Sequence, residues 1–180
     1  MRKVAVVAAR VLMFDFQKNY FELFALPLDY DVDLLQLKRK HREVILQTHP
    51  DRFVNATPQE KRLALQYSAY ANEGLQILTS SVKRSAYLLG LLGCPVDFEK
   101  SSAMSPNFLM KQMHLREQLA VQRNDQQAMQ QLKCSIEKEI TVIEKQLHAL
   151  FLERSQDALS QARELTLELR FFEKLMQEIR

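Results

Sequence analysis

The sequence predicts an all-α protein, built as a helical hairpin followed by a three-helix bundle. Its 180 residues include only 3 glycines and 5 prolines, and the strong helix formers Leu, Gln, Ala, Glu, Lys and Arg dominate the rest. An apolar fraction of 47% beside 26% charged residues is typical of a folded, soluble chain. Apolar residues recur at steps of three and four, which is the period of an amphipathic helix.

Prolines divide the first half of the chain, because proline cannot continue a helix from within. We expect a short aromatic helix at about 20–26, and a longer one from the capping residue Asp33 to about Thr48. The longer helix should bury one stripe at helical spacing. This stripe consists of Leu34, Leu37, His41, Val44 and Thr48.

The third helix has a strong start signal, with Thr57 as the cap, Pro58 in the first helical position and Glu60 three residues after the cap. It should extend to about Leu78. Because the connection of residues 49–57 is short, the second and third helices must pack as an antiparallel hairpin. The loop then stands at the tip of this hairpin.

A second unit is expected after Gly90, Gly93 and Pro95. Helical patterns at about 106–123, 125–152 and 155–179 indicate a coiled-coil-like three-helix bundle. We therefore divide the chain into an N-terminal extension at 1–12, a first domain with a connecting helix at 13–92, a linker at 93–105 and the bundle at 106–180.

The first bundle helix carries two apolar faces. At about 100° per residue, Phe108, Leu115 and Leu119 share one arc. The roughly opposite arc is rich in methionine and consists of Leu109, Met110, Met113 and Glu117. One arc can meet the core, and the other is a candidate binding surface. The alternative is that the first unit or a second copy covers it. Phe171 similarly lies off the stripe that contains Phe172.

Residues 49–51 read His-Pro-Asp, and a basic cluster precedes them. The cluster consists of Lys38, Arg39, Lys40 and Arg42, and it can steer an acidic partner or simply be solvated. Pro50 fixes the backbone, His49 offers two ring nitrogens, and the Asp51 carboxylate can bind a cationic group bidentately. The alternative is that His49 caps the preceding helix and Asp51 only makes a turn.

This first unit resembles a J-domain. The resemblance rests on the short first helix, the basic second helix, the tripeptide with Arg52 after it, and the close of the third helix at 72–78, Arg84 and Tyr87. Ser81 stands where many members have proline. There is no Gly/Phe-rich linker and no CxxCxGxG repeat. The layout is similar instead to the iron–sulfur co-chaperone family HscB, over about residues 19–180. The matching segments are 20–27, 84–89, 108–119 and 169–175.

This resemblance implies an L-shaped, two-domain co-chaperone. Its J-domain would dock on an HscA-type Hsp70 ATPase and stimulate ATP hydrolysis, and its bundle would present the scaffold protein IscU. The residues implied for chaperone binding are Lys38, Arg39, Lys40, Arg42, His49, Pro50, Asp51 and Arg52. Those implied for scaffold binding are Leu109, Met110, Met113, His114, Glu117, Val121 and Phe171. Family members often have acids where this chain has His114 and Val121, so we expect a less anionic interface with weaker salt dependence.

The chain is not expected to be an enzyme or to hold a cofactor or metal. It has no phosphate-cradling glycine loop and no nucleophile elbow, and its four histidines do not follow metal-ligand spacing. Cys94 and Cys134 have no CxxC partner, and we expect reduced, buried thiols. Two other functions stay open: a J-domain adaptor for a different client, and a small helical hydrolase that uses His49 and Asp51.

We expect a monomer of the bacterial cytoplasm that binds neither nucleic acid nor membrane. No apolar run approaches the roughly 18 residues that cross a bilayer. The three basic residues of the extension, Arg2, Lys3 and Arg10, are weakly similar to a mitochondrial presequence, and Met13 is a plausible alternative start.

Overall fold

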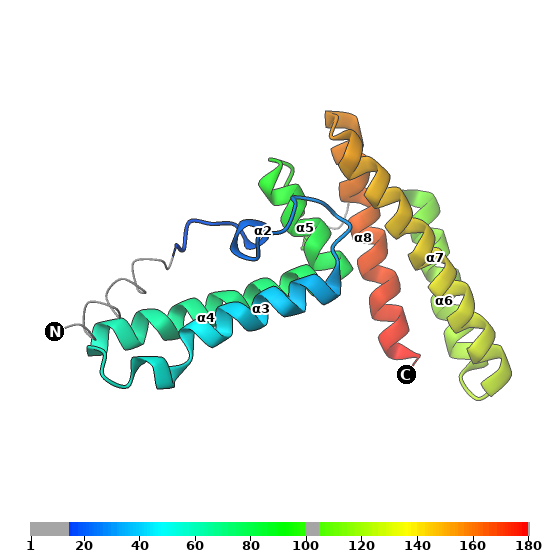
Figure 1. Cartoon of the computed structure of the whole chain (residues 1–180). Helices are drawn as coiled ribbons and strands as arrows, with labels where there is room; N and C mark the ends of the chain where they lie inside the picture. The colour runs from blue at the N-terminus through cyan, green and yellow to red at the C-terminus, as the bar shows by residue number, and fades with distance from the viewer. Residues whose placement is uncertain (1–14, 100–104, 180) are drawn as a thin grey trace. The chain divides into compact units, whose positions relative to one another are not determined.

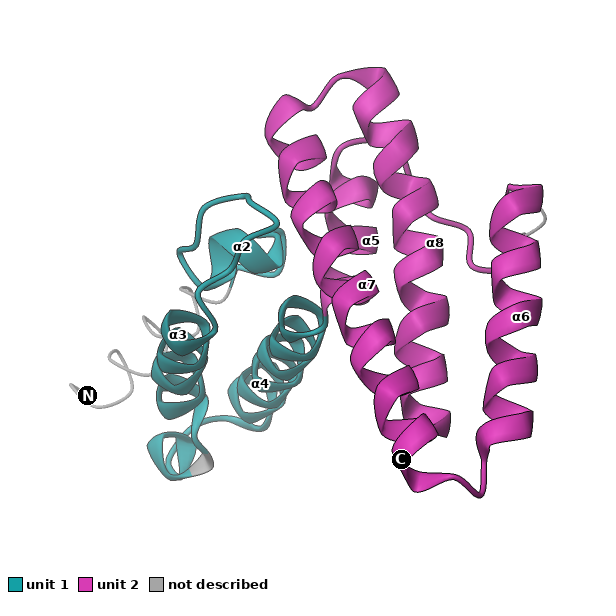
Figure 2. Ribbon diagram, turned by 90° about the vertical axis from the view of Figure 1, so that its right-hand side faces the viewer, with its two compact units in different colours: residues 1–80 teal, residues 81–180 magenta. Residues whose placement is uncertain are grey.

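The computed structural model describes residues 15–99 and 105–179, and every regular element in these ranges is helical (Figure 1). The predicted N-terminal extension at 1–12 and part of the predicted linker lie outside the described residues. The chain divides into two compact units, residues 1–80 and 81–180 (Figure 2). None of the described helices is both long enough and apolar enough to cross a membrane.

The first unit contains α2 (Tyr20–Leu23), α3 (Leu34–Thr48), the 3-10 turn η1 (Pro50–Phe53) and α4 (Pro58–Thr79), with α3 and α4 side by side (Figure 1). The side chain of Asp33 caps α3, and Thr57 and Glu60 form the predicted capping box of α4. Of the predicted stripe of α3, Leu37 and Thr48 are buried and His41 and Val44 are half-buried, whereas Leu34 is exposed in the first turn.

Helix α2 ends earlier than predicted because the chain turns at Ala25. This residue has a φ of 51°, the left-handed conformation that commonly ends a helix. The N–H of Leu26 donates to the carbonyl of Phe21 at 2.8 Å, and the N–H of Ala25 donates to that of Glu22 at 3.2 Å. These two bonds satisfy the last carbonyls of α2 and direct the chain into Pro27.

Glycine is required at position 74, where α2 crosses α4. A Cβ there would lie 2.7 Å from Cδ1 of Tyr20 and 3.1 Å from Cε2 of Phe24. The missing side chain therefore lets both buried rings reach the α4 backbone. The largest fully buried side chains of this unit are Phe21, Phe24, Leu37, Phe53 and Leu78.

The second unit contains α5 (Ser81–Leu91), α6 (Pro106–Gln122), α7 (Gln126–Glu153) and α8 (Gln156–Glu178). The last three match the predicted bundle helices, with side-chain caps from Ser105, Asp125 and Ser155. Helices α7 and α8 pack along their length, α5 packs on α8, and α6 contacts α7.

Helix α5 belongs with the second unit, whereas the sequence analysis grouped it with the first domain. Its Ser85 hydroxyl is hydrogen-bonded at 2.5 Å to that of Thr166 in α8, and both residues are fully buried. A polar pair of this kind fixes the register of two helices. Glu173 accepts the Val82 N–H at the start of α5; burial raises its pKa, and this hydrogen bond opposes the shift.

The two thiols differ in exposure. Cys94 is half-buried, and its Sγ lies 3.9 Å from the carbonyl oxygen of Leu159. Cys134 is exposed on α7, so the prediction of a buried thiol is wrong at this position.

Replacing Gly74 with alanine should destabilise the first unit by about 1 to 3 kcal/mol, because the new methyl group overlaps a buried ring. Gly90→Ala is a matched control, since a Cβ at that helical position meets nothing within 4 Å. It should stabilise the protein by roughly 0.5 to 1 kcal/mol through helix propensity. Urea unfolding followed by circular dichroism measures both effects, and a Gly74→Ala variant as stable as the parent would contradict the close-contact explanation.

Candidate functional site

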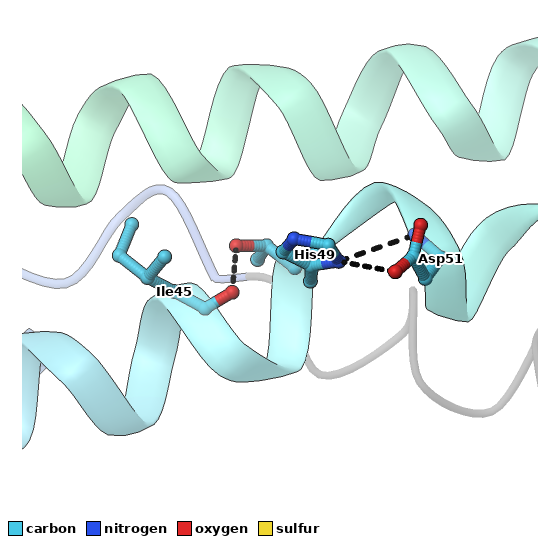
Figure 3. A network of polar contacts seen from close by, with 4 residues as sticks. Ile45, His49 and Asp51 are labelled. Atoms are coloured by element: carbon cyan, nitrogen blue, oxygen red, sulfur yellow. Dashed lines mark hydrogen bonds and ion pairs between the residues drawn. The ribbon is translucent and has the colours of Figure 1, made fainter.

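The tip of the α3–α4 hairpin carries the His-Pro-Asp tripeptide. Helix α3 ends at Thr48, whose hydroxyl contacts the carbonyl of Ile45 at 3.2 Å. Nδ1 of His49 then lies 3.3 Å from the amide nitrogen of Asp51 and 3.4 Å from its carboxylate (Figure 3). Neutral Nδ1 accepts the amide N–H, and protonated Nδ1 donates to the carboxylate, so the two contacts are alternatives. In either protonation state, His49 holds Asp51 in place.

Both side chains of the tip are also open to a partner. The side chain of His49 is 51% exposed and that of Asp51 is 86% exposed, while Phe53 of the same turn is buried and anchors it. His49 is thus the C-cap residue of α3, and its side chain also caps the turn that follows. This capping is compatible with recognition, because the oxygens of the Asp51 carboxylate remain accessible.

The predicted basic face consists of three residues rather than four. Lys38, Arg39 and Arg42 are exposed on α3. Lys40 is half-buried, pairs with Glu43 at 3.0 Å, and lines a pocket of about 450 Å³ together with Arg52.

Two exposed leucines extend this face, and the sequence analysis did not single them out. Leu35 and Leu46 follow the same steps of three and four as Arg39 and Arg42. The spacing carried this signal, since these leucines lie off the buried stripe. The outer face of α3 therefore has a cationic centre and apolar ends.

The second candidate surface is the outer face of α6. Phe108 is the one buried residue of this helix. Met110 and Met113 are 62% and 73% exposed, and the other exposed side chains of this face include Leu109, His114, Glu117 and Val121. The predicted two-faced character of the helix is confirmed. Since these apolar groups face solvent within their unit, they are a candidate for an adaptable binding surface.

Phe171 differs from the sequence prediction, which placed it off the core stripe. Its ring is only 8% exposed, and it packs edge to face with Phe108 and Phe172 at centroid distances of 5.6 and 5.5 Å. The guanidinium of Arg116 lies 5.9 Å from its centroid. The expected exposed ring is wrong because α6 covers this side of α8, and Phe171 supports α6 from beneath.

A polar contact gives α6 a second anchor. Nζ of Lys111 lies 2.8 Å from the carboxylate of Glu139 in α7 and 5.3 Å from the Phe172 centroid in α8. Burial raises the pKa of the neighbouring Glu168. The positive charge of Lys111 opposes this shift, and the carboxylates of Glu164 and Glu139 reinforce it. One lysine thus links α6 to both of the other bundle helices.

These two surfaces carry recognition groups, and they lie on different units. In residues 15–99 and 105–179, no three His, Cys, Asp or Glu side chains are grouped so that they could hold a metal ion. A helical hairpin with a basic helix and a His-Pro-Asp tip, whose His49 and Asp51 side chains are exposed, defines a J-domain-type co-chaperone.

Comparison with known proteins identifies the family. Residues 104–180 match the family model described as the HSCB C-terminal oligomerisation domain. A co-chaperone protein HscB homolog from Bordetella petrii is 37% identical over 161 residues, which cover 89% of this chain and 94% of that relative. The chain belongs to the HscB family of co-chaperones.

Solved structures agree with this assignment. Chaperone HscB from Vibrio cholerae has a TM-score of 0.80 at 29% identity, covering 90% of this chain and 95% of that one. Human co-chaperone HscB shares the fold with a TM-score of 0.85 at 24% identity, covering 92% and 82%.

Alanine substitutions should distinguish the residue that supports α6 from a residue on its exposed face. Phe171→Ala should lower the free energy of unfolding by about 3 kcal/mol, because it leaves a cavity beside Phe108 and Phe172. Met113→Ala removes an exposed side chain and should change it by less than about 0.5 kcal/mol. Denaturant titration of both variants tests this, and equal small effects would contradict a packing role for Phe171.

Proposed function

We propose that this co-chaperone recruits an IscU-type iron–sulfur scaffold protein to an HscA-type Hsp70 ATPase, stimulates ATP hydrolysis and so promotes cluster transfer. The observation that carries the proposal is the presence of two exposed surfaces on different units of one chain: the His49–Asp51 tip and the Met-rich face of α6. Membership of the HscB family supports the pairing of these two partners.

The tip would act by binding one state of the ATPase better than another. The accessible Asp51 carboxylate can accept two hydrogen bonds from an arginine of the ATPase, while Lys38, Arg39 and Arg42 favour encounter with an acidic surface. Pro50 restricts the backbone between His49 and Asp51, and Arg52 lines the adjoining pocket together with the paired Lys40 and Glu43. Preferential binding to the hydrolysis-competent arrangement shifts the population of the ATPase toward it.

The α6 face would hold the scaffold. Leu109, Met110 and Met113 supply its apolar centre, Glu117, His114 and Val121 lie beside it, and Phe171 seats the helix. A scaffold bound here and a chaperone bound at the tip are tethered through one chain, which raises the effective concentration of one at the other. This chain then accelerates hydrolysis without taking part in its chemistry.

The same proposal includes a location in the bacterial cytoplasm, in keeping with the bacterial relative from Bordetella petrii. The expected monomer has no such support, since the matching family model is described as an oligomerisation domain. A J-domain adaptor for another client is the second candidate. It predicts ATPase stimulation without binding to the scaffold. A helical hydrolase would instead show activity without chaperone or ATP.

The Asp51→Asn variant should lose stimulation of steady-state ATP turnover by the HscA-type chaperone. An amide offers one acceptor oxygen in place of two and carries no charge, so the bidentate contact is lost. Scaffold binding should be unchanged. Asp31→Asn makes the same chemical change in an exposed loop at the opposite end of α3 and should stimulate like the parent. Full stimulation by Asp51→Asn would contradict the proposed role of the tip in ATPase stimulation.

The Leu109→Ala, Met113→Ala double variant should weaken the scaffold complex by several kcal/mol at most, measured by isothermal titration, and should keep basal ATPase stimulation. If this variant and Asp51→Asn each lose both activities while remaining folded, the two surfaces do not act separately, and the proposal is contradicted.

A further inference from the structure

A cavity of about 560 Å³ lies beside α6, at the end of the bundle where α6 leads into α7. Its lining combines two arginines of the α6 end with apolar groups and one acid from α8. The lining residues are Arg116, Leu119, Ala120, Arg123, Met129 and Glu178. None of them belongs to the residues predicted to bind the chaperone or the scaffold.

This arginine pocket borders the Met-rich face of α6. Arg116 and Arg123 are seven residues apart, so they lie nearly in line along the helix. At about 100° per residue they are roughly 60° and 80° around the axis from Met113, on the side opposite His114 and Val121. A partner that covers the apolar face therefore reaches the two guanidinium groups along one edge.

The two arginines of the pocket form no ion pair with the described carboxylates. In the part of the chain that the structure describes, neither Arg116 nor Arg123 has a carboxylate within ion-pair distance. Lys111 on the same helix, in contrast, is paired with Glu139 at 2.8 Å. The pocket thus presents two cations and one acid, Glu178, over an apolar floor. Guanidinium groups bind carboxylates bidentately, and the floor can receive the methylene groups of an acidic side chain.

We propose that the arginine pocket receives an aspartate or glutamate of the partner that covers the α6 face, so that the docking segment of this partner is apolar with an acidic flank. This inference rests on the proposed function and specifies the chemistry of the scaffold surface. It also revises the weak salt dependence expected from the sequence, because exposed arginine–carboxylate contacts are screened by added salt.

The test is isothermal titration of the full chain with the IscU-type scaffold at low and high salt. Arg116→Gln with Arg123→Gln should weaken binding about tenfold and flatten its salt dependence. Lys138→Gln with Lys145→Gln removes the same two charges from exposed positions on α7 and should leave affinity within about twofold. Arg123→Gln alone, which leaves the Arg116–Phe171 contact intact, should give a smaller loss in the same direction.

Several results would overturn the inference. If the arginine variants bind the scaffold with unchanged affinity while the Leu109→Ala, Met113→Ala double variant binds it more weakly, the pocket does not take part in scaffold binding. The proposed function would then be unaffected. Equal losses in the arginine and lysine variants would mean that only net charge matters. Self-association of the free chain that the arginine variants abolish would assign the pocket to a second copy. A wild-type chain that does not bind the scaffold would overturn the proposed function and this inference together.

Discussion

The contact of Phe108 with the rings of Phe171 and Phe172 determines what the second unit can present. Phe108 is the one buried residue of α6, so this aromatic cluster and the Lys111–Glu139 pair together hold the helix on the bundle. A helix held along one narrow line keeps the rest of its surface free. The Met-rich face and the neighbouring arginines are exposed for this reason, and their positions depend on how the three rings pack.

The first unit likewise depends on a few buried contacts. Gly74 lets Tyr20 and Phe24 approach the α4 backbone, and Phe53 anchors the turn that follows His49. Each of these contacts is made by buried side chains, whereas His49 and Asp51 of the candidate surface are exposed. The tip can therefore expose a charged carboxylate and an imidazole while its backbone is fixed by η1 and by the Nδ1 contact of His49.

Helix positions could be predicted closely from the sequence because their signals are local. Asp33, Thr57, Ser105, Asp125 and Ser155 cap the helices from within a few residues of their starts. The end of α2 was missed because an alanine occupies the left-handed position that glycine usually takes. The assignment of α5 failed for a different reason: its partner Thr166 is far away in the sequence.

The candidate site shows the same limit. Helical periodicity correctly separated the outer arc of α6 from its inner arc, since both arcs belong to one helix. It could not place Phe171, because only the packing of α6 on α8 decides whether that ring is exposed. Nor could it find the arginine pocket, whose lining comes from three helices. Periodicity describes one helix at a time, whereas a pocket is a property of their arrangement.

The two surfaces also differ in the physics that they offer a partner. The tip and the outer face of α3 present solvated charges, which accelerate encounter but add little to affinity when they stay exposed. The α6 face offers apolar groups that a partner can desolvate, and burial of this kind mainly slows dissociation. A chain of this design is suited to a brief contact at the hairpin and a longer one at the bundle. The proposed function requires this order of lifetimes, because the client would have to stay bound at the bundle while the hairpin engages and leaves the ATPase.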